Sequence, residues 1–82
     1  MTYRVELSRH VLKQLADLPL SVQVALAETL AVVAVAPYDP TTSDPTVVEG
    51  VRQAGFAEVG LVEYLIWDDL LVVVALNLLW GG

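Results

Sequence analysis

The chain has 82 residues, enough for one small domain, and 56% of them are hydrophobic while 17% are charged. Ten acidic residues outnumber four Lys and Arg residues, giving a net charge of −6. This balance argues against autonomous nucleic-acid binding, because phosphates are held by clustered basic side chains. The sequence has no Cys and one His, which excludes disulfides, thiolate metal sites and His-rich zinc sites and fits a reducing cytoplasm.

The first strand and the first helix are predicted within residues 3–18. Apolar and polar residues alternate from Tyr3 to Leu7, as in a half-buried strand. Ser8 can cap a helix whose apolar residues follow at helical spacing. This helix should end near Leu18, because the proline that follows disfavours a helical residue before it. The polar N-terminus has no apolar run of the kind found in secretion signals.

A second helix is predicted from Ser21, its expected cap, to about Val35. It is apolar on two faces, so we expect it to be buried on two sides. Residues 37–46 hold three prolines and predict a surface loop. After this loop we expect a short extended piece over 47–51 and a strand over 56–59.

The most apolar segment, Leu61 to Trp80, is predicted to form a core hairpin rather than a membrane span. Glu63, Asp68 and Asp69 lie in its first half, where charges are costly at bilayer depth. The uncharged remainder is shorter than the about 20 residues that a spanning helix needs. Its β-branched and aromatic side chains favour strands, and the Asp-Asp pair predicts the turn between them.

A two-residue turn would pair Leu65 with Val72 and Glu63 with Val74, although the lack of glycine allows a loop longer by one or two residues. Two helices cover only one face of such a sheet. Because Glu63 prefers water, its face should be the uncovered one. With this register the face also carries Leu61, Leu65, Trp67, Leu70, Val72, Val74, Leu76, Leu78 and Trp80. An apolar surface of this kind needs a partner, so Leu65, Trp67, Leu76, Leu78 and Trp80 are predicted to bind one.

Few polar residues are candidates for a functional site. Glu63 is a solvated charge, a general base or an acceptor for an Arg or Lys of a partner. Arg9 and Lys13, beside His10, are an exposed first turn or a basic patch for a partner's acidic segment. The sequence contains no phosphate-binding loop, metal motif or nucleophile–base pattern, so we expect no metal site and no cofactor.

Two further polar residues lie within the hairpin. Tyr64 and Asn77 are expected to pack in the core with satisfied hydrogen bonds. Trp67 and Trp80 are expected to anchor a protein interface, where tryptophan is enriched, because no basic residues accompany them to hold nucleic acid.

The chain resembles the RelE/ParE superfamily, the toxin-like half of type II toxin–antitoxin pairs. The resemblance rests on YRVELSRHVLKQLADLP, on a second helix that ends at a proline, and on GFAEVGLVEYLIWDDLLVVVALNLLW. It implies one α+β domain over residues 1–82 in which two helices pack on one face of a small antiparallel-rich sheet, in the order β-α-α-β-β-β. It also implies an antitoxin partner and, for many members, ribosome-dependent cleavage of messenger RNA.

The sequence departs from the superfamily at its catalytic positions. Members commonly carry Arg after the central glycine, whereas Gly60 is followed by Leu61, Val62 and Glu63. The preceding segment contains Glu58 instead of arginines, and the last strand ends at Trp80. No catalytic residue of the family transfers to this chain.

We therefore expect a toxin-like protein that binds an antitoxin-like chain or a second copy of itself in the cytoplasm, without direct nucleic-acid binding. Two alternatives stay open. One is a divergent ribosome-dependent messenger RNA endoribonuclease with Glu63 as base, and the other is a toxin that inhibits DNA gyrase.

Overall fold

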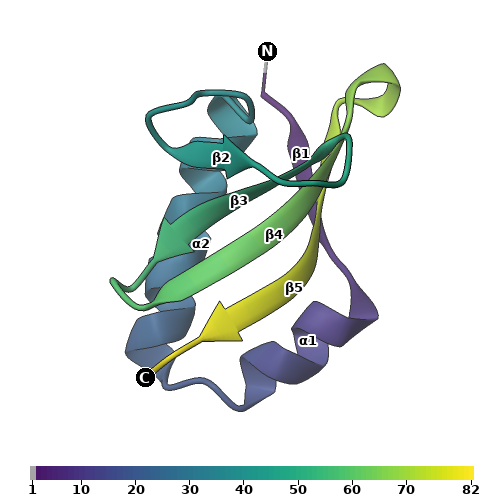
Figure 1. Cartoon of the computed structure of the whole chain (residues 1–82). Helices are drawn as coiled ribbons and strands as arrows, with labels where there is room; N and C mark the ends of the chain where they lie inside the picture. The colour runs from purple at the N-terminus through teal and green to yellow at the C-terminus, as the bar shows by residue number, and fades with distance from the viewer. Residues whose placement is uncertain (1) are drawn as a thin grey trace.

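The structure, a computed structural model, describes residues 2–82 and contains a five-stranded mixed sheet (Figure 1). The elements are β1 (Arg4–Leu7), α1 (Arg9–Ala16), α2 (Leu20–Val35), β2 (Ser43–Pro45), β3 (Val51–Phe56), β4 (Gly60–Trp67), the 3-10 turn η1 (Asp68–Leu70) and β5 (Val72–Trp80). In the strand order β1-β5-β4-β3-β2, β1 runs parallel to β5 and the other pairs are antiparallel. The predicted fold class and element order are confirmed. No helix within residues 2–82 is long and apolar enough to cross a membrane.

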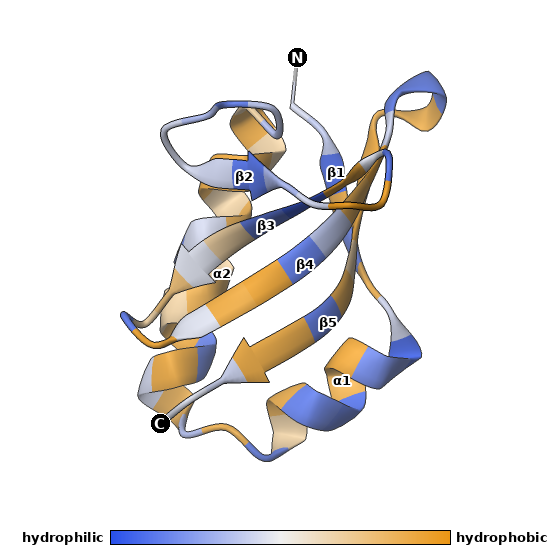
Figure 2. Ribbon diagram, viewed as in Figure 1, coloured by the Kyte–Doolittle hydropathy of each residue, from blue (hydrophilic) through white to orange (hydrophobic). Residues whose placement is uncertain are grey.

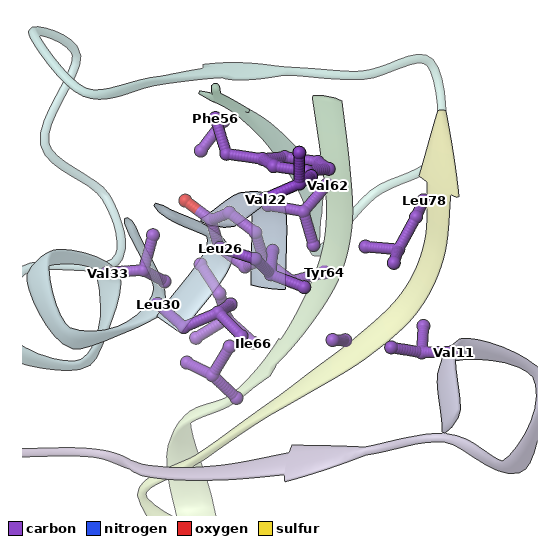
Figure 3. Close-up of a cluster of buried hydrophobic side chains, with 13 residues drawn as sticks. Val11, Val22, Leu26, Leu30, Val33, Phe56, Val62, Tyr64, Ile66 and Leu78 are labelled. Atoms are coloured by element: carbon purple, nitrogen blue, oxygen red, sulfur yellow. The ribbon is translucent and has the colours of Figure 1, made fainter. Parts of the chain in front are cut away.

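The core lies between α2 and the sheet (Figures 1 and 3). Apolar residues of α2 recur every three or four positions on its inner side, at Val22, Leu26, Leu30 and Val33. Opposite them, the strands contribute Ala54, Phe56, Val62, Tyr64, Ile66, Val73, Ala75 and Leu78. The hydroxyl of the fully buried Tyr64 donates to the backbone oxygen of Pro37 at 2.8 Å. This confirms the core hydrogen bond expected for Tyr64, which leaves no buried polar atom unpaired there.

The helix α1 lies beside β5 and completes the edge of that strand. β1 pairs only with the first half of β5, so the later backbone groups need other partners. Gln14 supplies two of them, because its Nε2 donates to Leu78 O and its Oε1 accepts from Leu78 N, each at 2.8 Å. Ser8 caps α1 as predicted by accepting from Val11 N, and its hydroxyl also donates to Leu76 O. These side chains protect an otherwise open strand edge.

The tip of the β4–β5 hairpin is held by Asp68. Its carboxylate oxygens accept hydrogen bonds from the hydroxyls of Tyr3 and Tyr38, both at 2.6 Å. These bonds lower the pKa of Asp68 below its ordinary value. They also raise the pKa of Tyr38 to about 12, and raise the pKa of Tyr3. Asp68 therefore has the turn role predicted for it and fastens the hairpin tip to the start of the chain and to the loop after α2.

The predicted start of the second helix is wrong. Helix α2 begins at Leu20 with Pro19 at the N-cap position, and no side chain caps it. The predicted cap, Ser21, therefore lies inside the helix. Gln23 instead fastens this end of α2, because its Nε2 donates to the backbone oxygens of Leu15 and Leu18, each at 3.0 Å.

The predicted bounds of the strand before β4 are also wrong. Residues 51–56 form β3, whereas the segment after it is a turn in which Ala57 and Glu58 have φ angles of 51° and 65°. Residues 47–50 form a turn as well, and the expected surface loop contains β2. The bounds of β3 were missed because its sequence, VRQAGF, is made largely of small and polar residues and lacks the alternation that identifies strands.

The register of the hairpin differs from that of a two-residue turn. Four residues, 68–71, connect the strands, so Leu65 pairs with Val74 rather than with Val72. An irregularity between Glu63 and Tyr64 then shifts the pairing further, and Glu63 lies opposite Asn77. This β-bulge leaves Leu76 as the extra residue and reverses which face the end of β5 presents.

Candidate functional site

The candidate site is the sheet face opposite α2, here named the open face. Register places on it the side chains of Val51, Gln53, Leu61, Glu63, Leu65, Trp67, Val74, Asn77 and Leu79. Arg4 and Glu6 extend it onto β1, and Asp44 extends it onto β2. The expectation that the face of Glu63 lacks helices is therefore met, since α2 packs on the other face (Figure 1).

A chain of polar side chains crosses the centre of the open face. Asn77 Nδ2 donates to Glu63 Oε1 at 2.9 Å, and Asn77 Oδ1 lies 3.0 Å from His10 Nε2. An amide oxygen can only accept, so His10 Nε2 carries the proton in this arrangement. Gln53 lies opposite Glu63 on the neighbouring strand. Figure 2 shows these hydrophilic positions as a band across β3, β4 and β5.

Apolar side chains lie on both sides of this polar band. Leu61 pairs with Leu79 on one side, and both are exposed. On the other side Leu65 pairs with Val74, and Trp67, which is 52% exposed, follows. The carboxylate of Glu63 therefore lies between two apolar strips, where water solvates its charge less well than in bulk solvent.

The open face has little positive charge to hold a phosphate backbone. Arg4 forms an ion pair with Glu6 at 2.8 Å. Arg52 lies in β3, but it pairs in register with the buried Tyr64 and so belongs to the helix side. Its guanidinium donates to Ser43 Oγ and Ser43 O, each at 2.8 Å. The acidic groups Glu6, Glu63 and Asp44 dominate, and they repel nucleic acid.

The structure separates the residues predicted to bind a partner. Leu65 and Trp67 lie on the open face. Leu78, predicted to share that face, is only 4% exposed and belongs to the core. Trp80 also lies on the helix side, where its ring stacks on that of Phe56 at a centroid distance of 6.3 Å. The bulge causes both errors, because it reverses the faces of the last residues of β5.

The other residues singled out in the sequence lie at different places on and around the open face. Leu76 is half-buried at the bulge. Arg9 and Lys13 are exposed on α1, near the end of the polar band marked by His10. Glu58, which stands where the family carries arginines, lies in the β3–β4 turn. Asn77 is half-buried on the open face rather than in the core.

Sequence reasoning missed the link between His10, Asn77 and Glu63. Asn77 is the one polar residue of β5, and an amide inside an apolar strand was a usable signal that a polar partner lies beside it. The bulge that brings Asn77 opposite Glu63 has no such signal, because no glycine or proline marks it. The two hydrogen bonds from Gln14 to the edge of β5 were also missed, because they join residues that lie far apart in the sequence.

A hollow of about 220 Å³ lies beside α2. It is lined by Thr29, Val32, Val33, Thr42 and Gly55. It contains no titratable side chain, so it offers no acid–base chemistry. Within residues 2–82 no group of three or more His, Cys, Asp or Glu residues could hold a metal ion.

Comparison with known proteins gives matches among solved structures alone. No family model and no curated protein sequence matches the chain. A RelBE toxin–antitoxin complex of Mycobacterium tuberculosis matches with a TM-score of 0.85 at 21% identity, over 99% of this chain and 100% of that one. The isolated RelE toxin of Escherichia coli matches with a TM-score of 0.82 at 16% identity, over 98% of this chain and 85% of that one.

A third structure is an arginine-to-alanine variant of the E. coli toxin RelE in complex with an antitoxin RelB peptide. It matches with a TM-score of 0.84 at 17% identity, over 100% of this chain and 86% of that one. The superposition thus covers nearly the whole chain in every case. At these identities the likeness establishes architecture, and function has to be argued from the site. The chain has the fold of the RelE toxins.

Proposed function

We propose that this protein is the toxin-like component of a type II toxin–antitoxin pair and that it acts in the cytoplasm by binding another protein, without ribonuclease chemistry of its own. The fold supports this, because matched structures include RelE bound to RelB-type antitoxins. The partner is an antitoxin-like chain or a second copy of the protein.

The open face carries the proposal. The resemblance to the RelE/ParE superfamily implies that members with ribonuclease activity have a basic open face. Positive charge there must hold phosphates and stabilise the charge that develops during cleavage. Here the centre of the face is Glu63, and Arg4 is already paired with Glu6. An acidic centre between apolar strips suits a polypeptide and opposes RNA.

A second exposed apolar surface also favours a protein partner. On the outer side of α2, Leu20, Val24, Ala27 and Ala31 are exposed at alternating spacings of four and three residues. This is the spacing of a seam between two helices. Leu20 is 74% exposed and Val35, at the end of the helix, is 67% exposed. The outer side of α2 is exposed in the single chain, whereas a helix that is apolar on most sides is normally buried, so we expect a partner to cover this side.

The test is messenger RNA cleavage in a purified translation system. The chain is added to ribosomes stalled on a defined message, and the message is mapped by primer extension. We expect intact message at chain concentrations where a ribonuclease-active RelE toxin, run in parallel, cleaves it. Cleavage that requires the chain and the ribosome would overturn the proposal.

One observation favours a second candidate, a ribosome-dependent endoribonuclease. Glu63 is held in a fixed orientation by Asn77 and lies at the centre of the open face, as a general base would have to. This candidate predicts growth arrest on expression, relieved by Glu63→Gln. The proposed function predicts no arrest from either version.

A further inference from the structure

We propose that Glu63 is a subsite for one guanidinium or ammonium group of a partner polypeptide, flanked on that polypeptide by an apolar side chain on each side. The inference rests on the proposed protein-binding function and specifies the chemistry of the segment that is bound. The occupant is a segment of the form apolar–cation–apolar, centred over the polar band of the open face.

The first support is the orientation of the carboxylate. Asn77 Nδ2 holds Glu63 Oε1 at 2.9 Å, and the amide is oriented in turn by His10 Nε2 at 3.0 Å. No hydrogen bond from residues 2–82 reaches Glu63 Oε2, and the half-buried side chain has no basic partner within that range. The second oxygen therefore remains to accept from outside, and a charged donor makes the stronger hydrogen bond.

The second support is the surface around this oxygen. Leu61 and Leu65 precede and follow Glu63 by two residues on β4, so their side chains emerge on the same face about 7 Å to either side. Leu79 and Val74 lie opposite them on β5. A segment with apolar side chains about 6–7 Å on either side of a cation matches this spacing, either extended with i±2 spacing or helical with i±4 spacing. Packing there would exclude water from the ion pair and strengthen it.

The third support is charge complementarity. The nearby arginines have other partners. Arg4 forms an ion pair with Glu6, and Arg52 donates hydrogen bonds to Ser43 on the helix side of the sheet. The cation for Glu63 must therefore come from a partner. Arg9 and Lys13 are exposed on α1 at the border of the face, so a uniformly basic segment would be repelled there. One central cation fits better than a basic run.

The experiment is selection of peptides from a phage-displayed random 12-residue library on the immobilised chain. The same library is selected in parallel on Glu63→Gln and on Glu49→Gln. The second variant is the matched control, because Glu49 loses the same charge in the exposed turn before β3. A selected peptide is then synthesised and titrated against each chain, with tryptophan fluorescence as the readout.

We expect the wild-type chain and Glu49→Gln to enrich peptides with one Arg or Lys between apolar residues. Glu63→Gln should lose this preference and bind the selected peptide at least tenfold more weakly. Equal binding to Glu63→Gln, or enriched peptides without a cation, overturns the subsite. If such peptides still lose affinity with Leu61→Ser, the protein-binding face survives and only the subsite fails. Selection of no peptide at all contradicts both the subsite and the proposed function.

Discussion

Replacing Gln14 by Ala should destabilise the protein by exposing the unprotected edge of β5. In the wild type, the Gln14 amide makes two hydrogen bonds of 2.8 Å to the backbone N–H and C=O of Leu78. A typical hydrogen bond contributes about 1 kcal/mol net, and a partly buried group left without a partner costs more. We therefore expect a loss of about 2 kcal/mol in the free energy of unfolding. For a domain of this size, that lowers Tm by about 8–16 °C.

The assay is thermal and urea unfolding followed by circular dichroism, combined with amide hydrogen exchange. The Leu78 amide should exchange about 30-fold faster in Gln14→Ala, as the same free energy implies. Gln14→Glu retains an acceptor for Leu78 N but loses the donor, so its stability should be intermediate. Lys13→Ala is the matched control, because Lys13 is exposed on the same helix. Wild-type stability of Gln14→Ala, with unchanged exchange at Leu78, would refute the role of α1 as the cover of this edge.

The other predictions concern the hairpin tip, the core and the outer side of α2. Because the pKa of Tyr38 is raised to about 12 from 10.0, its contribution to stability is fully present below pH 10 and is lost as pH rises through 12. The lowered pKa of Asp68 acts in the opposite range, so its contribution is present above its ordinary pKa of 3.8 and is lost as pH falls. Urea titrations across both ranges test this, and Asp68→Asn should flatten both slopes. Tyr64→Phe should lower the free energy of unfolding by about 1–3 kcal/mol in urea titrations, because it leaves the buried oxygen of Pro37 without its donor. An unchanged midpoint would count against that hydrogen bond. Val24→Glu should reduce self-association in sedimentation without lowering Tm, whereas a folding defect would place Val24 in the core instead.

The architecture could be predicted because several local signals agree with it. Ser8 marks the start of α1 and the proline after Leu18 marks its end. The period-two pattern identifies β1, and Asp68 marks the hairpin turn. Each of these signals depends on residues next to one another in the chain, so it can be recognised without the tertiary structure.

The composition of the open face could be predicted only in part. Alternation along β4 correctly separates Glu63 and Leu65 from Tyr64. It fails on β5 after Ala75, because a bulge shifts every later side chain to the other face. A bulge depends on how two strands fit together rather than on either strand alone, so the positions of Leu78 and Trp80 could not be inferred from periodicity.

The hydrogen bonds that hold the site together were beyond reach for a related reason. His10, Asn77 and Glu63 come from three separate elements. Their association depends on the placement of α1 beside β5, which follows from contacts far apart in the sequence. The sequence singles out Glu63 among the polar residues of the hairpin, but it does not identify the residues that orient its side chain.

The most direct test of the central claim is the solution mass of the purified chain, measured by light scattering over a dilution series. The exposed apolar residues of the open face and of α2 predict that the chain does not remain single. We expect a mass of at least twice the 8.9 kDa of one chain, or aggregation that a co-expressed partner relieves. A persistent dimer would identify a second copy as the partner. A well-behaved monomer of 8.9 kDa at every concentration would contradict the claim that these surfaces exist to bind protein.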